Sequence, residues 1–131
     1  MSANPNIPTI LVAEDEQELR LLIAQTLREA GYLVVEAADG ASAVAVARST
    51  HPNLILLDIL MPHTDGTAVL RALREDAWGK DVPVIIFTNY TLDDDITQKL
   101  AEFTPAYYLV KSDWSVGAVV EKIREVLKQH A

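Results

Sequence analysis

The segment Leu54-Ile55-Leu56-Leu57-Asp58 decides the fold, because it joins a strand-sized apolar run directly to a carboxylate. A run this short, entirely apolar, is typical of a strand that is buried on both faces of a parallel sheet. Similar runs recur along the chain, separated by helix-length amphipathic stretches. The other runs are Thr9–Ala13, Tyr32–Glu36, Val84–Phe87 and Ala106–Val110. This alternation is typical of βαβ units, in which parallel strands lie between layers of helices.

Helical spacing of apolar residues predicts the segments between these runs. The first helix is indicated by Leu19, Leu22, Ile23, Leu27 and Ala30. It is closed by Gly31, a residue that commonly ends a helix. The last helix has Val116, Val120, Ile123 and Leu127 on one face. Its candidate N-caps are Ser112 and Asp113. Weaker patterns predict helices over Asp39–Ser49 and Leu92–Phe103. We therefore expect an α/β three-layer sandwich of five strands and five helices.

Length and composition fit one domain without disulfides. The chain has 131 residues, half of them hydrophobic, and no cysteine. This size allows one sizeable core, and the lack of cysteine fits a reducing compartment, so we expect a cytoplasmic protein. Residues 1–8 are polar and contain prolines, which predicts a flexible leader before a domain at residues 9–131. A net charge of −8 and short apolar runs argue against nucleic acid and membrane as partners.

Polar residues follow four of the predicted strands. The first strand ends at Glu14-Asp15, the third at Asp58 and the fourth at Thr88, while Lys111 follows the fifth. Ligands of open α/β sheets bind beyond the carboxyl ends of the strands, so these residues should converge on one edge. Gathered carboxylates need a compensating cation, and Mg²⁺ favours oxygen ligands of this kind. Taken singly, each residue also has a structural interpretation as a helix N-cap, a turn former or a solvated lysine.

The spaced set resembles the response-regulator receiver domain of two-component signalling, the CheY-like family. The resemblance rests on Ile10-Leu11-Val12-Ala13-Glu14-Asp15-Glu16, Asp58-Ile59-Leu60-Met61-Pro62, Asp65-Gly66, Thr88 and Tyr108-Leu109-Val110-Lys111, and covers nearly the whole chain. It implies a doubly wound, flavodoxin-like sandwich with a parallel sheet in the order 2-1-3-4-5. A receiver is a signalling domain and not an enzyme, apart from catalysing its own phosphorylation and dephosphorylation.

The resemblance also implies roles for single residues. Asp58 would be the phosphoacceptor, and Glu14 and Asp15 would hold Mg²⁺, or Mn²⁺, together with Asp58 and the backbone carbonyl of Leu60. Lys111 would be the active-site cation, while Thr88 and Tyr108 would form a conformational switch. The phosphoryl group would come from a histidine kinase or a histidine phosphotransfer protein. A downstream protein would bind the face formed by the fourth helix, the fifth strand and the fifth helix.

Some residues depart from the family pattern. Ser112 stands where a proline commonly follows the lysine, so we expect a trans peptide between Lys111 and Ser112. Leu60, Asn89 and Tyr90 would flank the approach to the phosphoryl group. Leucine cannot orient an attacking water and tyrosine mainly obstructs it, which predicts slow hydrolysis of the acyl phosphate, although the amide of Asn89 offers one polar group.

Three other classes fit less well. A haloacid-dehalogenase-like phosphotransferase needs a second aspartate two residues after the first, where this chain has Leu60. A flavodoxin-like nucleotide binder needs a glycine- or serine-rich loop after the first strand, where Glu14-Asp15-Glu16 would repel phosphate. A pseudo-receiver, acting only as a phosphorylation-independent protein-interaction module, is expected to lack Asp58 or an acidic-pair residue. The sequence leaves open whether the domain is a natural single-domain protein or part of a longer one.

Overall fold

A computed structural model describes residues 7–61, 65–89 and 94–130, with the side chains of 94–97 excluded. The strands are β1 (Thr9–Ala13), β2 (Leu33–Ala37), β3 (Leu54–Leu57), β4 (Val84–Thr88) and β5 (Tyr107–Val110). The α-helices are α1 (Gln17–Glu29), α2 (Gly40–Thr50), α3 (Gly66–Glu75), α4 (Asp94–Ala101) and α5 (Val116–Gln129). A short 3₁₀ helix, η1 (Lys111–Asp113), joins β5 to α5.

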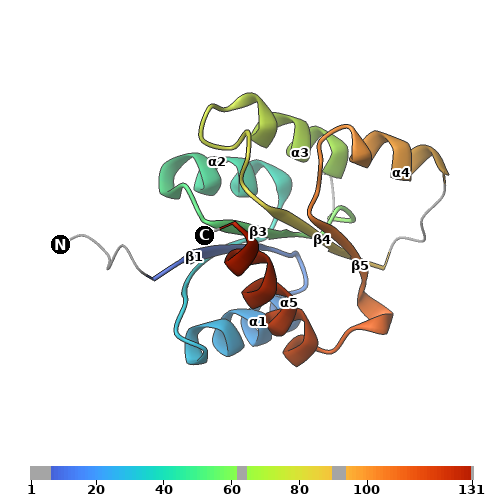
Figure 1. Ribbon diagram of the computed structural model, residues 1–131. Helices are drawn as coiled ribbons and strands as arrows, with labels where there is room; N and C mark the ends of the chain where they lie inside the picture. Colours follow the sequence, from blue (N-terminus) through green and yellow to red (C-terminus); the bar gives the residue numbers. More distant parts are fainter. Residues whose placement is uncertain (1–6, 62–64, 90–93, 131) are drawn as a thin grey trace.

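The sheet has five parallel strands in the order β2-β1-β3-β4-β5, which confirms the predicted topology. The helices α2, α3 and α4 cover one face of the sheet, and α1 and α5 cover the other (Figure 1). The order in which the chain adds strands to the sheet reverses between β1 and β3, which are adjacent although β2 lies between them in sequence. This switch point is where the carboxyl ends of the strands leave a crevice for a ligand.

Alternate residues of each buried strand face opposite layers. In β3, Ile55 and Leu57 pack with α2 and α3, whereas Leu54 and Leu56 pack with α1 and α5. All four are buried, which explains why the run is apolar throughout and shows no period-two alternation. The central strands are therefore fixed on both faces, and the residues at their carboxyl ends are held in register.

Several predicted boundaries need small corrections. The β2 strand begins at Leu33 and not at Tyr32, because the Tyr32 N–H still donates to the Leu27 carbonyl at the end of α1. Gly31 has a φ of 100°, as a glycine that closes a helix requires. Ala106 precedes β5, and Thr88 extends β4 by pairing with Val110.

The predicted N-caps of α5 are wrong. Ser112 and Asp113 lie in η1, and Ser115 caps α5 by accepting a hydrogen bond from the Ala118 N–H at 3.1 Å. The chain needs a turn after β5 before it can enter α5, so the cap comes later than the first polar residues. The fourth helix begins at Asp94 and ends at Ala101, and residue 92 of its predicted start lies outside the described residues.

At the amino end, the Pro8 carbonyl accepts a hydrogen bond from the Leu33 N–H at 3.1 Å. The rest of the predicted leader, apart from Ile7, lies outside the described residues. Within the described chain, no helix has the length and apolar character needed to cross a membrane.

Candidate functional site

Two central strands place carboxylates side by side at one edge of the sheet. Glu14 follows β1 directly, and its N–H donates to the Ala37 carbonyl at 2.9 Å. Asp58 follows β3, and its N–H donates to the Ala13 carbonyl at 3.0 Å. These bonds continue the parallel ladder past the strand ends. The backbone of each acidic residue is therefore fixed by the sheet and does not depend on loop conformation.

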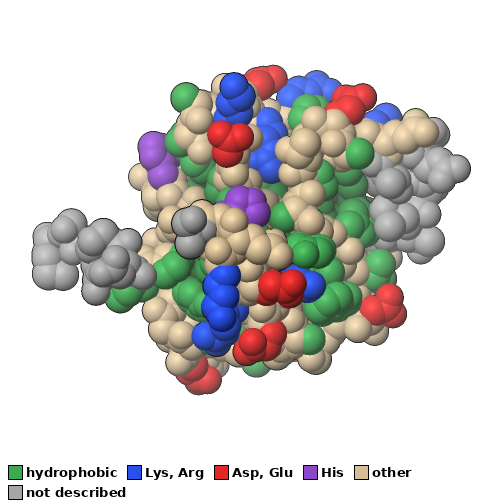
Figure 2. All heavy atoms as spheres, viewed as in Figure 1, with side chains coloured by type: hydrophobic (Ala, Val, Ile, Leu, Met, Phe, Trp, Pro, Cys, Tyr) green, Lys and Arg blue, Asp and Glu red, His purple; other side chains and the backbone are tan. Residues whose placement is uncertain are grey.

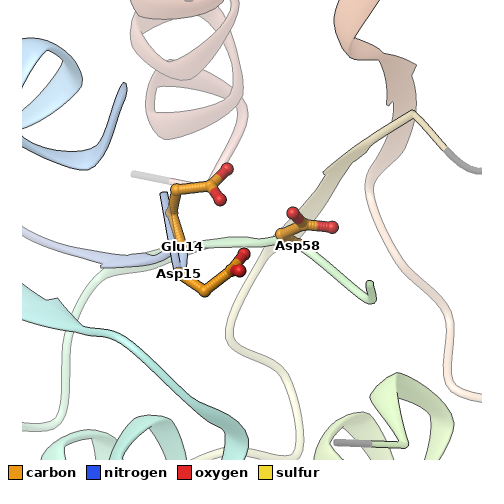
Figure 3. Close-up of side chains that lie close together, drawn as sticks. All are labelled: Glu14, Asp15 and Asp58. Atoms are coloured by element: carbon orange, nitrogen blue, oxygen red, sulfur yellow. The ribbon is translucent and has the colours of Figure 1, made fainter. Parts of the chain in front are cut away.

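Glu14, Asp15 and Asp58 form one acidic cluster. Each offers a carboxylate oxygen, and these oxygens all lie within 4.8 Å of one another. Figure 3 shows the three side chains lying close together at the ends of β1 and β3. Glu14 and Asp58 are only 2% and 4% exposed, whereas Asp15 is half-buried. Buried like charges at this separation are costly without a compensating cation.

Lys111 supplies one positive charge to this cluster. Its ammonium lies 2.8 Å from Asp58 Oδ2 and 2.5 Å from Glu14 Oε1. The other Asp58 oxygen, Oδ1, accepts from the Leu60 N–H at 2.8 Å, and Glu14 Oε2 accepts from the Glu16 N–H at 3.0 Å. One lysine thus joins two carboxylates whose remaining oxygens are held by backbone donors. Three carboxylates against one ammonium leave an excess of negative charge.

Burial and hydrogen bonding act in opposite directions on the pKa of Glu14, and likewise on the pKa of Lys111. Burial raises the pKa of Glu14, and the charge of Asp58 adds to the rise, while hydrogen bonds from Lys111 and Glu16 lower it without cancelling the effect. Burial alone would lower the pKa of Lys111, but hydrogen bonds to Asp58 and Glu14 outweigh it and the pKa is raised. The lysine therefore stays charged, and Glu14 is the carboxyl group for which ionisation is disfavoured.

Thr88 and Tyr108 lie on neighbouring strands. Thr88 pairs with Val110, and Tyr108 stands two residues before Val110, so their side chains point to the same face of the sheet. Thr88 is fully buried, and Tyr108 is half-buried against the apolar cluster under α2 and α3. The structure thus brings the two predicted switch residues to one face, beside the strand that ends at Asp58.

The residues predicted to flank the approach differ in exposure. The Leu60 side chain is 48% exposed although its N–H binds Asp58. Asn89 is exposed at the end of β4. Tyr90 lies outside the described residues. The peptide between Lys111 and Ser112 is trans, as expected, since the described part of the chain contains no cis bond.

Arg20 is a supporting residue that the sequence did not reveal. Its guanidinium donates to the Glu14 carbonyl at 2.9 Å and pairs with Glu36 at 3.3 Å. It therefore ties α1 to the backbone of the acidic cluster and to the edge strand β2. An arginine on an amphipathic helix carries no signal of this role, because most such residues face solvent.

Comparison with known proteins agrees with the arrangement. A family profile described as the response regulator receiver domain matches residues 10–124. The chain belongs to the response-regulator receiver family. The receiver is also similar to "Chemotaxis response regulator CheY4" of Vibrio cholerae, with a TM-score of 0.83 and 26% identity over 92% of this chain and 99% of that one. The predicted family and fold are therefore confirmed.

Curated relatives carry further sequence beyond the receiver. The "Probable transcriptional regulator ycf27" of Cyanophora paradoxa is 41% identical over 126 residues, covering 95% of this chain and 50% of that protein. The "Phosphate regulon transcriptional regulatory protein PhoB" of Pseudomonas aeruginosa is 34% identical, covering 92% of this chain and 52% of that protein. The chain spans about half the length of the curated relatives it matches.

Proposed function

We propose that Asp58 accepts a phosphoryl group from a phosphohistidine in a Mg²⁺-dependent reaction. The observation that carries the proposal is the position of Asp58 in contact with the Lys111 ammonium and in one cluster with the carboxylates of Glu14 and Asp15. An Asp58 oxygen attacks phosphorus, the bond from phosphorus to the imidazole nitrogen breaks, and an acyl phosphate forms. Phosphorylation by a small phosphodonor, read by intact mass, tests the proposal.

Lys111 and the backbone around Asp58 stabilise the transfer. The lysine is positioned to neutralise charge on the transferring group, and the Leu60 N–H holds one carboxylate oxygen so that the side chain is oriented before reaction. The position two residues after Asp58 is Leu60, which offers no general acid for a separate substrate. We therefore propose a signalling domain, not an enzyme that turns over a substrate, and the slow hydrolysis expected from Leu60, Asn89 and Tyr90 stays a prediction.

The acidic cluster fits a hard divalent cation. The cluster offers carboxylate oxygens that carry an excess of negative charge, and Mg²⁺ prefers such ligands. Mn²⁺ takes the same donors. We propose that Glu14, Asp15, Asp58 and the backbone carbonyl of Leu60 hold the ion. When bound, Mg²⁺ neutralises charge on the phosphoryl oxygens during transfer.

We expect the double variant Glu14→Gln, Asp15→Asn to bind Mg²⁺ at least about tenfold more weakly than the parent, because it loses two of the three anionic ligands. Isothermal titration calorimetry measures the dissociation constant directly. Glu18→Gln, in the first turn of α1, is the matched control and should leave the affinity unchanged. Equal affinity in the double variant and the parent would contradict the proposed metal site.

We also propose that Thr88 and Tyr108 couple phosphorylation to the face formed by α4, β5 and α5. An acyl phosphate at Asp58 adds negative charge and acceptor oxygens, which attract the Thr88 hydroxyl. Movement of that hydroxyl leaves space on the face that Tyr108 shares, so the tyrosine ring can turn inward. This places the downstream partner's surface one strand away from the phosphorylation site.

We expect beryllium fluoride, a phosphoryl mimic, to change the NMR shifts of the Tyr108 ring in the parent and not in Thr88→Ala. The alanine variant lacks the hydroxyl that the mimic attracts. Thr88→Ser keeps that hydroxyl and should respond as the parent does. If the Tyr108 signals moved equally in the alanine and serine variants, the tyrosine would respond to something other than the Thr88 hydroxyl.

The proposed phosphodonor is a histidine kinase or a histidine phosphotransfer protein. Leu60 is adjacent to the site, and Leu21 and Leu22 lie on α1, which begins shortly after Asp15; all three are about half exposed. Exposed large apolar side chains of this kind suit transient contact with a protein donor. The proposal includes a cytoplasmic location, supported by the absence of cysteine, and no nucleic-acid or membrane partner for this domain.

A further inference from the structure

The turn that carries Lys111 has little support of its own. Lys111 opens η1, directly after the edge strand β5, and Ser112 and Asp113 are exposed. The turn is closed by a long hydrogen bond of 3.3 Å from the Trp114 N–H to the Lys111 carbonyl. Ser112 does not restrict its own φ as proline would. The geometry of this turn therefore depends on where Trp114 is held.

Trp114 packs against the apolar cluster that the sheet forms with α1 and α5, and it also contacts a lysine from the next helix. The Lys122 ammonium, on α5, lies 5.7 Å from the centroid of the Trp114 ring and 4.3 Å from that of Tyr107 in β5. The Lys122 side chain is only 18% exposed. Contacts between a cation and an aromatic ring strengthen when water is partly excluded. One side chain of α5 thus joins the strand before the turn to the residue that closes it.

Gly117 lies in the first turn of α5, and a Cβ at this position would meet nothing within 4 Å, so no close contact requires glycine there. Glycine adds backbone freedom and weakens a helix at its position. Figure 2 shows Lys, Arg, Asp and Glu side chains mixed over α5. Lys122 differs from the other charged residues of this helix in its contact with the two rings.

We propose that Lys122 is a positioning residue for Lys111 and acts through the rings of Tyr107 and Trp114. This inference rests on the proposed phosphorylation of Asp58. Lys111 must keep its ammonium within hydrogen-bonding distance of Asp58, and displacement by about 1 Å is enough to slow a reaction markedly. Lys122 holds the end of the turn, so that the Lys111 side chain enters the site from a fixed backbone position.

The test compares phosphorylation of the full chain by acetyl phosphate in saturating Mg²⁺. We expect Lys122→Met to lower the rate constant about fivefold, without weakening Mg²⁺ binding. Lys122→Arg should restore most of the rate, because arginine also binds aromatic faces. Lys128→Met removes a charge from the last turn of the same helix, and Glu125→Gln removes the ion-pair partner of Lys122; both should react as the parent does.

A double-mutant cycle separates positioning from general destabilisation. In a Lys111→Met background, adding Lys122→Met should cause no further loss of rate, because the group it positions is absent. If the two substitutions lowered the rate constant by factors that multiply in the double variant, or if Lys122→Met alone left the rate unchanged, the inference would be overturned while phosphorylation of Asp58 stood. A parent protein that takes up no phosphoryl group would overturn the proposed function and this inference together.

Discussion

Acetyl phosphate and Mg²⁺ should add one phosphoryl group to the parent protein and none to Asp58→Asn. The carboxylate of Asp58 is buried among the groups that would stabilise transfer, whereas an amide at this position is a poor nucleophile and cannot form an acyl phosphate. Intact mass spectrometry measures the gain directly. Chelation of Mg²⁺ should reduce the modified fraction of the parent to background.

Asp39→Asn is the matched control for the loss of a carboxylate near a strand end. Asp39 follows β2 and caps α2 by accepting from the Ser42 N–H at 2.7 Å, and asparagine preserves such a cap. This variant should be phosphorylated as the parent is. If Asp58→Asn acquired the label at the parental rate, another residue would be the phosphoacceptor.

The sheet and the acidic cluster could be predicted because both depend on local sequence. A strand buried on both faces must be apolar throughout, and the run Leu54–Leu57 meets that condition. The carboxyl ends of parallel strands share one edge, so the sequence predicts that Glu14 and Asp58 meet there, and their oxygens lie within 4.8 Å. The proposed roles of these residues rest on the resemblance to receivers.

Contacts between distant elements could not be predicted in the same way. Arg74 on α3 donates to the carbonyls of Gly79, Val82, Phe103 and Thr104. It thereby ties the loop before β4 to the loop before β5, yet its spacing resembles that of any solvent-facing arginine on α3. The contact of Lys122 with Trp114 likewise depends on how α5 packs against β5. Side chains that reach across elements leave no periodic signal in the sequence.

Removing the ammonium of Lys111 should have the largest effect on stability. In Lys111→Met the buried carboxylates of Glu14 and Asp58 lose their shared partner, and we expect the free energy of unfolding to fall by about 3 kcal/mol at pH 7.5 in chelator. Chemical denaturation followed by circular dichroism measures this difference. Lys80→Met, at an exposed position, is the control and should change it little.

The pH dependence distinguishes lost charge from lost packing. A carboxyl whose pKa is raised by folding stabilises the protein fully below its unfolded pKa, near 4.5 for Glu14, and this contribution is lost as the pH rises through the folded value. Without the lysine we expect the pKa of Glu14 to rise further. The loss in free energy of unfolding caused by Lys111→Met should therefore be small near pH 5 and grow toward pH 8. Saturating Mg²⁺ should reduce this loss of stability, because the ion binds the folded cluster and replaces the missing charge. If the loss of stability in Lys111→Met did not change with pH or Mg²⁺, Lys111 would stabilise the fold by packing its aliphatic chain. The charge of the acidic cluster would then be neutralised by groups other than Lys111.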